Sequence, residues 1–343
     1  MSLDGKVVLI TGGTGSFGKK FVEITLKNYS PRKIIVFSRD EFKQHQMATS
    51  GFDRECMRYF IGDVRDKDRL YRALDGVDFV VHTAALKQIP ACEYNPIEAV
   101  KTNVLGAANL IDAAIERNVK KVLAISTDKA VAPVNLYGAT KLCADKLFVA
   151  GNSYSGVHVT RFSVVRYGNV VGSRGSVIPL FTKMASSGTL PITDERMTRF
   201  WLTLDQAVRF VLKSLERMEG GEIFVPKIPS MNILDLAEAV APACSINIVG
   251  IRPGEKLHEV LIPRDDARYT VEHDDSFVIL SGVKQDRIDN YLNRYGGKVC
   301  DEDFSYSSET NTQWLSVREL RSVLGFGVAQ PKASSKRKDS KGL

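Results

Sequence analysis

The first half of the chain alternates short, almost uninterrupted apolar runs with longer stretches whose apolar residues recur at helical spacing. The apolar runs predict strands at residues 6–11, 33–38, 58–62, 77–83, 121–126 and 158–167. The stretches between them predict helices at 18–28, 66–74, 97–118 and from 137 to about 150. Apolar strands that alternate with helices indicate a parallel sheet covered on both faces. We therefore expect an α/β fold with a doubly wound sheet, which binds ligands at the carboxyl ends of its strands.

The pattern changes after Gly168, where glycine, proline and serine become frequent and the predicted elements become shorter. Helices are still expected at 204–218, which could pack back on the sheet, and at 233–240. We assign residues 1–168, together with about 202–228, to the sheet domain. Residues 169–201 and 229–330 would form a smaller lobe interleaved with it. Residues 331–343 are rich in serine and lysine and predict a basic, disordered tail.

The composition is that of an ordinary soluble globular protein. The 343 residues are 44% hydrophobic and 25% charged, and no apolar run approaches the roughly 20 residues of a membrane helix. The first strand starts so early that we expect no signal peptide. The five cysteines are scattered and form no Cys-x-x-Cys pair, which is typical of reduced thiols in the cytoplasm. The five histidines form no metal-ligand cluster, so no metal is expected.

The net charge of +7 is concentrated at the end of the chain. The tail from residue 331 to 343 holds five basic residues and one acidic residue, so the rest of the chain is only weakly basic. This distribution is a weak case for a nucleic-acid surface. Basic residues that hold the phosphates of a small ligand explain it at least as well.

The loop that follows the first predicted strand is rich in glycine. Residues 11–18 read TGGTGSFG, and Gly12, Gly15 and Gly18 form a Gly-x-x-Gly-x-x-Gly pattern. Such glycines permit a tight turn, a close approach to a pyrophosphate and the packing of helix on strand. A glycine triplet also occurs in purely structural turns, but its place between a strand and a helix predicts a dinucleotide site. The expected contact residues are Gly12, Thr14, Gly15, Ser16, Phe17 and Gly18.

The ends of the next strands supply the rest of the expected cofactor site. The second strand ends in Ser38 and Arg39, and an arginine at this place accommodates the 2′-phosphate of NADP. Asp40 and Glu41 follow, so NAD remains an alternative, and Arg39 could also be a solvated loop residue. Further along the chain, the expected cofactor-binding residues are Asp63 and Val64 for the adenine, and Ala84, Ala85 and Lys87 for the nicotinamide ribose.

Tyr137 and Lys141 are four residues apart, so a helix places them on one face. A lysine cation and an oxidised nicotinamide favour the phenolate, and we expect them to lower the pKa of Tyr137 towards neutrality. The tyrosine can then take a hydroxyl proton while hydride leaves the same carbon, with Thr127 bound to that hydroxyl. Tyr-x-x-x-Lys also occurs by chance on surface helices. Its place after a strand-end threonine and a glycine loop favours catalysis.

Asp128 and Lys129 follow Thr127 directly and are expected to border the same pocket. Once a sugar C4 is a ketone, the hydrogen at C5 is acidic, and a base and an acid can together expel water across C5 and C6. Asp128 would be the acid, and Lys129 the base if its surroundings lower its pKa. A surface ion pair in a turn is the alternative. Which group reprotonates C5 stays open.

These motifs resemble the extended short-chain dehydrogenase/reductase family, and within it the inverting UDP-N-acetylglucosamine 4,6-dehydratases of pseudaminic acid biosynthesis. The resemblance covers nearly the whole chain apart from the tail, and Asp128-Lys129 is its most specific part. It implies a Rossmann sheet that holds NADP tightly, with Tyr137 and Lys141 as both catalytic and cofactor-binding residues, and assembly into dimers or hexamers. It implies a UDP-sugar substrate and no nucleic-acid or membrane partner.

The resemblance also implies a set of substrate contacts. An arginine matches a diphosphate, and a carboxylate accepts hydrogen bonds from ribose hydroxyls. The expected substrate-binding residues are Lys87, Asn169, Ser173, Arg174, Thr193, Met197, Arg199, Arg252 and Glu255, with Glu93 and Asn103 as weaker candidates. Three other functions remain open. A UDP-sugar 4-epimerase or a retaining dehydratase would use the same tyrosine and lysine, and a scaffold protein that senses NADP would use the cofactor site alone.

Overall fold

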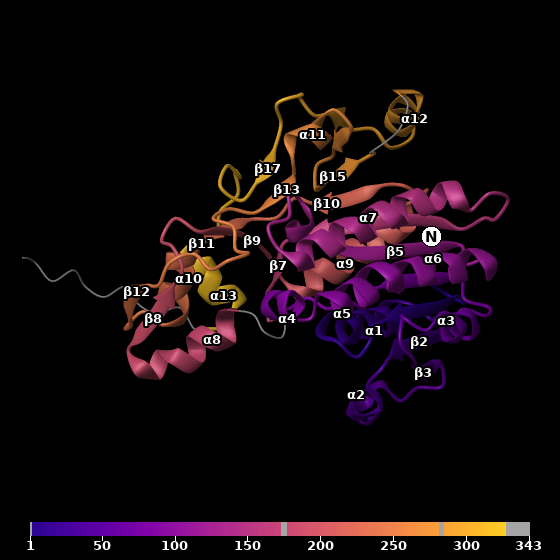
Figure 1. Cartoon of the computed structure of the whole chain (residues 1–343), viewed down its shortest axis with the longest axis horizontal. Coiled ribbons are helices and arrows are strands. Elements are labelled where there is room, and N and C mark those ends of the chain that lie inside the picture. The colour runs from indigo at the N-terminus through magenta and orange to yellow at the C-terminus, as the bar shows by residue number, and fades with distance from the viewer. Residues whose placement is uncertain (1, 173–176, 281–284, 327–343) are drawn as a thin grey trace, which may run out of the picture.

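The computed structural model describes residues 2–172, 177–280 and 285–326, which form a large sheet domain and a smaller lobe beside it (Figure 1). In the described residues the main sheet has ten strands, in the order β16-β14-β15-β10-β6-β5-β4-β1-β2-β3. Seven of these strands run parallel to their neighbours: β1 Val7–Thr11, β2 Lys33–Ser38, β3 Met57–Ile61, β4 Phe79–His82, β5 Lys121–Thr127, β6 Arg161–Tyr167 and β10 Ile223–Pro226. The run from β3 to β6 has the 3-2-1-4-5-6 order of a doubly wound sheet, so the expected fold class is confirmed.

Three antiparallel strands extend the sheet beyond β10. They are β15 Ser276–Ile279, β14 Thr270–Glu272 and β16 Lys298–Val299, and each pairs with its neighbour in antiparallel register. These residues lie in the segment that the sequence assigned to the smaller lobe. Val271, Phe277 and Val278 are buried in the main hydrophobic core, which explains why the segment joins the sheet.

Helices cover both faces of the sheet. Helix α1 (Ser16–Asn28) packs beside α9 (Leu204–Arg217), whereas α6 (Gly106–Glu116) packs between α3 (Lys67–Ala73) and α7 (Leu136–Tyr154). The helix expected at 97–118 is interrupted, because α5 (Pro96–Val100) is joined to α6 by a π-helical turn, Lys101–Leu105. The remaining helical segments of this domain are α2 Glu41–Met47, the π-helical turn Ala48–Phe52, α4 Ile89–Tyr94 and the 3-10 turn Asp128–Ala130.

The smaller lobe has a hydrophobic core of its own, in which Phe181, Trp201, Met231 and Leu236 are buried. Two small sheets and three helices surround this core: β7 Asn169–Val170, β9 Thr198–Leu202 and β11 Ser230–Asn232; β8 Thr189–Ile192 and β12 Ser245–Ile248; α8 Val177–Met184 with the 3-10 turn Ala185–Ser187, α10 Ile233–Val240 and α13 Val317–Val323. In Figure 1 this lobe lies beyond the end of the sheet at which β7 and α4 are seen.

A third group of elements links the two parts. The antiparallel pair of β13 (Val260–Ile262) and β17 (Tyr306–Ser307) lies beside α11 (Arg264–Ala267), and α12 (Gln285–Tyr295) lies between β15 and β16 in the chain (Figure 1). Tyr306 is buried against Phe200 and Phe277, so this pair joins the lobe to the sheet domain. Within the described ranges, no helix is both long and apolar enough to cross a membrane.

Candidate functional site

A single cavity of about 1230 Å³ runs from the glycine loop to the smaller lobe. One end is walled by the glycine loop and by residues that follow β2, β3 and β4. The middle is walled by the end of β5 and the start of α7, and the far end by residues 252–256 and the strands of the lobe. The cavity therefore lies at the carboxyl ends of the parallel strands, where doubly wound sheets bind their ligands.

The glycine loop has the geometry that a dinucleotide pyrophosphate requires. Gly12 has φ +65° and lies against Ala84, and a Cβ on Gly18 would lie only 2.3 Å from the carbonyl oxygen of Gly13. Gly15 faces open space apart from the Gly12 carbonyl oxygen, and it begins α1 without any side-chain cap. The N-terminal N–H groups of α1 are thus left for an anion. Gly12, Thr14, Gly15, Ser16, Phe17 and Gly18 all line the cavity.

Two basic side chains that follow β2, those of Arg39 and Lys43, line the same cavity. Ser38 and Arg39 line it as expected, and Lys43, which the sequence analysis did not single out, lines it as well. Arg39 is half exposed and lies 3.6 Å from Asp63. Asp40 also lines the cavity, but its carboxylate accepts the Lys43 backbone N–H at 2.9 Å as the cap of α2.

The other expected cofactor residues line the cavity in the predicted order along the sheet. Asp63 and Val64 follow β3, and Ala84, Ala85 and Lys87 follow β4. Burial, and then the nearby charge of Lys129, lower the pKa of Lys87. Glu93 and Asn103 do not line the cavity, because their side chains bind backbone groups of Leu136 and Leu86.

The expected catalytic residues meet where α7 touches the end of β5. Asp128 and Lys129 lie in the 3-10 turn directly after β5, and Thr127 is the last residue of the strand. A Cβ on Gly138 would lie 2.1 Å from the Lys129 carbonyl oxygen, so only glycine lets the first turn of α7 pack against this turn. This contact brings the Tyr137 side chain next to Thr127.

The protein surroundings of Tyr137 act against the expected lowering of its pKa. Burial raises the pKa of Tyr137 to about 12, although Lys129 and the Thr127 hydroxyl lower it. Burial also lowers the pKa of Lys141, whose Nζ donates to the Ile125 carbonyl oxygen at 2.8 Å. The protein groups alone therefore do not bring the pKa of Tyr137 towards neutrality, because burial outweighs the favourable charges, and the expectation, which includes an oxidised nicotinamide, stays a prediction.

A buried network that the sequence did not predict lies behind Lys141. Asp145, one helical turn further along α7, accepts a hydrogen bond from the Ser126 hydroxyl at 2.7 Å and lies 3.6 Å from Arg166 Nη2. Burial raises the pKa of Asp145, and the charges of Arg166 and Lys141 oppose that rise. The network balances the buried lysine charge and fixes the face of α7 that carries Lys141.

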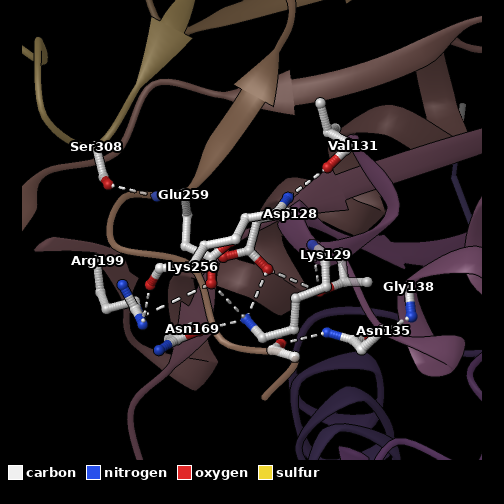
Figure 2. A network of polar contacts seen from close by, with 12 residues as sticks. Asp128, Lys129, Val131, Asn135, Gly138, Asn169, Arg199, Lys256, Glu259 and Ser308 are labelled. Carbon is white, nitrogen blue, oxygen red and sulfur yellow. Dashed lines mark hydrogen bonds and ion pairs between the residues drawn. The ribbon is translucent and has the colours of Figure 1, made fainter. Parts of the chain in front are cut away.

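Lys129 lies among oxygen atoms from three segments of the chain, as Figure 2 shows. Its Nζ lies 3.0 Å from Asp128 Oδ1, 3.3 Å from Glu259 Oε1 and 3.4 Å from Asn169 Oδ1. Burial lowers the pKa of Lys129, but the two carboxylates raise it further than burial lowers it. The sequence made a basic Lys129 conditional on a lowered pKa, and the protein groups around it do not meet that condition, so the resting side chain is a cation.

Asp128 is also placed differently from the expectation. Its side chain is fully buried and is not among the residues that line the cavity, whereas Lys129 is. The Thr127 hydroxyl donates to Asp128 Oδ1 at 2.8 Å, and the same oxygen accepts from Lys129. Asp128 thus contacts Thr127 and Lys129 without itself lining the cavity.

Some of the expected substrate-binding residues line the cavity and others do not. Asn169, Arg199, Arg252 and Glu255 line the cavity together with Lys87. Neither Thr193 nor Met197 lines it, and Met197 is buried in the core of the smaller lobe because its apolar side chain fills that core. Ser173 and Arg174, like the tail, lie outside the described residues.

Sequence analysis missed Glu259 and Lys256, which both line the cavity. Lys256 Nζ donates to the Val131 carbonyl oxygen, and Asn135 Nδ2 donates to the Gly254 carbonyl oxygen at 2.8 Å, which ties the loop before α7 to the lobe (Figure 2). The sequence RPGEKLHE offered charged residues but no spacing that pointed to Lys129. The described residues contain no cluster of His, Cys, Asp and Glu that could hold a metal ion.

Comparisons with known proteins place the chain in a family. A family model described as "Polysaccharide biosynthesis protein" matches residues 8–281. A "UDP-N-acetylglucosamine 4,6-dehydratase (inverting)" of Campylobacter jejuni is 57% identical over 94% of this chain and 98% of its own length. A "UDP-glucose 4-epimerase" of Rickettsia canadensis is 40% identical over 93% of this chain and 95% of its own.

A solved structure gives the same result for the fold. The X-ray structure of Pen from Bacillus thuringiensis is 38% identical, covers 94% of this chain and 98% of its own, and superposes with a TM-score of 0.85. The chain therefore belongs to the polysaccharide biosynthesis protein family, within the extended short-chain dehydrogenases/reductases.

Proposed function

We propose that the chain is an NADP-dependent, C5-inverting UDP-N-acetylglucosamine 4,6-dehydratase. The observation that carries the proposal is the Asp128–Lys129 pair, which lies beside Thr127 and Tyr137 in the cavity that also contains the glycine loop. Hydride transfer alone needs the threonine, the tyrosine and Lys141. An acid–amine pair at the same place is what the removal of water requires in addition. The inverting dehydratase of Campylobacter jejuni, 57% identical to this chain, supports the assignment.

In the proposed reaction, the role of each residue follows from its position in the site. A bound oxidised nicotinamide would supply a hydride acceptor and a positive charge that lowers the pKa of Tyr137. Tyr137 takes the proton of the C4 hydroxyl, and Thr127, which lies next to Tyr137, binds and orients that hydroxyl. Lys129, the member of the pair that lines the cavity, exchanges protons with the substrate, and Asp128 holds its amine.

One reaction tests the proposal. Purified protein and UDP-N-acetylglucosamine in deuterated water should give a 4-keto-6-deoxy sugar with deuterium at C5 and inverted configuration there, without consumption of added nicotinamide. Proton NMR of the reaction follows all three features. A product without deuterium at C5 would contradict the dehydratase, and deuterium with unchanged C5 configuration would indicate a retaining enzyme.

A UDP-sugar 4-epimerase is the second candidate, favoured by the Rickettsia canadensis relative. An epimerase uses Thr127, Tyr137 and Lys141 but leaves Asp128–Lys129 without a chemical role. Its product keeps the C6 hydroxyl, so the same NMR experiment separates the two functions. A scaffold that only senses NADP would show neither product, and Tyr137→Phe would leave its cellular phenotype unchanged.

The preference for NADP is supported by the basic side chains after β2. Arg39 and Lys43 both line the cavity, whereas the Asp40 carboxylate accepts the N-terminal N–H of α2 and pairs with Lys43. Two cations favour a 2′-phosphate over a hydroxyl. Calorimetry should show tighter binding of NADP than of NAD, and Arg39→Ala should remove most of the difference. Equal affinities would favour NAD.

The N-acetyl group of the substrate and a homo-oligomer, dimer or hexamer, are also part of the proposal, as is a cytoplasmic location. UDP-N-acetylglucosamine should be turned over faster than UDP-glucose. Sedimentation of the purified protein tests the oligomer directly.

A further inference from the structure

Glu259 is held firmly next to Lys129 by a segment far away in the sequence. It directly precedes β13, and its backbone N–H donates to Ser308 Oγ at 2.9 Å while its carbonyl oxygen accepts the Ser308 N–H at 2.8 Å. Its Oε1 lies 3.3 Å from Lys129 Nζ and 3.7 Å from Arg199 Nε (Figure 2). Three backbone carbonyl oxygens in turn fix the Arg199 guanidinium. The carboxylate is thus fixed from both sides at the inner wall of the cavity.

The two carboxylates around Lys129 differ in what stabilises their charge. Asp128 accepts hydrogen bonds from the Thr127 hydroxyl and from Lys129. Among the described residues Glu259 is bound through ion pairs alone, with Lys129 Nζ at 3.3 Å and Arg199 Nε at 3.7 Å from its Oε1, and its Oε2, like Asp128 Oδ2, is buried without a hydrogen-bond partner. A carboxylate with fewer donors holds a proton more readily. Glu259 also lines the cavity, which Asp128 does not.

We propose that Glu259 is a positioning residue that takes the proton of Lys129 and so frees the amine to act as the C5 base. The proton moves from Lys129 Nζ to Glu259 Oε1: an N–H bond breaks, an O–H bond forms, and a neutral amine faces a neutral carboxylic acid. The amine then takes the C5 proton. This inference rests on the proposed dehydratase function. It resolves the conflict between a basic role for Lys129 and its position between two carboxylates.

The charges around the pair are consistent with this exchange. Burial, and then Asp128, raise the pKa of Glu259, while the cations near it lower that pKa. The ionisable groups that face Glu259 or Lys129 are Asp128, Arg199, Lys256, Lys87 and Tyr137. Because the proton stays inside the pair, the net charge of this cluster does not change when it moves, so no uncompensated charge is created in the buried site.

Glu259→Gln tests the proposal because glutamine keeps the shape but cannot accept the proton. At neutral pH we expect C5 deuterium incorporation to fall about 10²-fold, the lower end of the usual contribution of a catalytic proton transfer. The amine of the variant must lose its proton to solvent. The ratio of variant to wild-type rate should therefore rise with pH, by about tenfold per unit below the pKa of Lys129. A ratio that does not change with pH would overturn the proposal, because a purely structural role lowers the rate equally at every pH.

Two further variants serve as controls. Glu259→Asp keeps a carboxylate and should restore a ratio independent of pH, even with a lower rate. Glu222→Gln removes a carboxylate that is equally buried but lies away from the cavity, where it binds Ser163 and the N–H groups of Glu219 and Gly220. It should lower thermal stability without changing the shape of the pH profile.

An NMR titration tests the pair without any reaction. In protein labelled with ¹³C-lysine, with Lys129 assigned by its substitution, Glu259→Gln should lower the pKa of Lys129 by about 1–3 units, the usual effect of losing one adjacent opposite charge. An unchanged pKa would overturn the proposal. If the wild-type enzyme leaves C5 unlabelled, the dehydratase assignment fails, and the titration alone then decides whether the charges of the two residues are coupled.

Discussion

Lys129 is the residue at which the proposed reaction departs from simple hydride transfer. It lines the cavity, and Asp128, Glu259 and Asn169 surround its Nζ within 3.4 Å. The sequence pointed to Lys129 because it follows the strand-end threonine. Its partner Glu259 could not be found in that way, since only the packing of β13 beside the 3-10 turn brings the two together.

Replacing Lys129 by alanine should separate two steps of the reaction. Thr127, Tyr137 and Lys141 remain, so bound cofactor should still be reduced on addition of substrate, which absorbance detects in a single turnover. Dehydration should fall about 10²- to 10⁴-fold, because the C5 base is lost. Tyr137→Phe is the comparison, since it should abolish the reduction itself. An alanine variant that releases 4-keto-6-deoxy product at the wild-type rate would disprove the role of Lys129.

The glycine loop shows, at the scale of elements, that glycines in one motif have different tasks. Gly18→Ala would place a Cβ 2.3 Å from the backbone of Gly13, so we expect it to cost about 1–3 kcal/mol of unfolding free energy and to weaken cofactor binding. Gly15 has φ −72°, and a Cβ there would meet only the Gly12 carbonyl oxygen, at 3.2 Å. Gly15→Ala should therefore cost less stability than Gly18→Ala and still weaken cofactor binding. Urea unfolding and calorimetry measure the two effects, and equal stability losses would contradict this division.

His82, at the end of β4, should make the sheet sensitive to acid. It is buried, Thr11 Oγ1 lies 2.9 Å from its Nδ1, and burial lowers its pKa from 6.5 to about 3. Because the folded-state pKa is depressed, the stabilisation is complete above pH 6.5. It is lost as the pH falls towards 3, since the unfolded chain takes the proton first.

The expected loss is about 1.4 kcal/mol per pH unit, or about 2 kcal/mol at pH 5. His82→Asn retains an acceptor for Thr11 but cannot titrate. Its unfolding free energy should be lower than that of the wild type at pH 7, and the difference should shrink by about 2 kcal/mol at pH 5. Parallel pH profiles of the two proteins in urea unfolding would rule out this role for His82.

At the scale of the whole molecule, local patterns predicted one part of the structure and not the other. The parallel strands from β3 to β6 were predictable, because each is a short, largely apolar run between helices. The antiparallel extension was not, since β14 and β16 are very short and the hairpin of β14 and β15 joins the sheet only through the distant strand β10. The cofactor half of the site follows adjacent strand ends and was likewise predictable. The residues of the lobe were not predictable. Contacts between segments far apart in the chain place Met197 in a core and Glu259 at the cavity.

The cavity contains both the proposed cofactor site and the proposed substrate site. A cofactor and a nucleotide should therefore stabilise the molecule through different residues. The glycine loop belongs to the sheet domain, whereas Arg252 and Glu255 belong to the segment that joins the lobe. NADP or UDP at 100 times its Kd should each add about 2.7 kcal/mol to the unfolding free energy. Gly15→Ala should reduce the thermal shift with NADP and preserve that with UDP, and Arg252→Ala should do the reverse.

The two ligands should also act together, because the loop before α7 contacts both parts. Asn135 binds the Gly254 carbonyl oxygen, and Lys256 binds that of Val131. When one ligand orders this loop, the second ligand loses less conformational entropy on binding, so the two ligands bind with positive coupling. The Kd of UDP should thus be lower in the presence of NADP, and Asn135→Ala should reduce the coupling while Gly15→Ala abolishes it. Equal UDP affinities with and without NADP would show that the two parts bind independently.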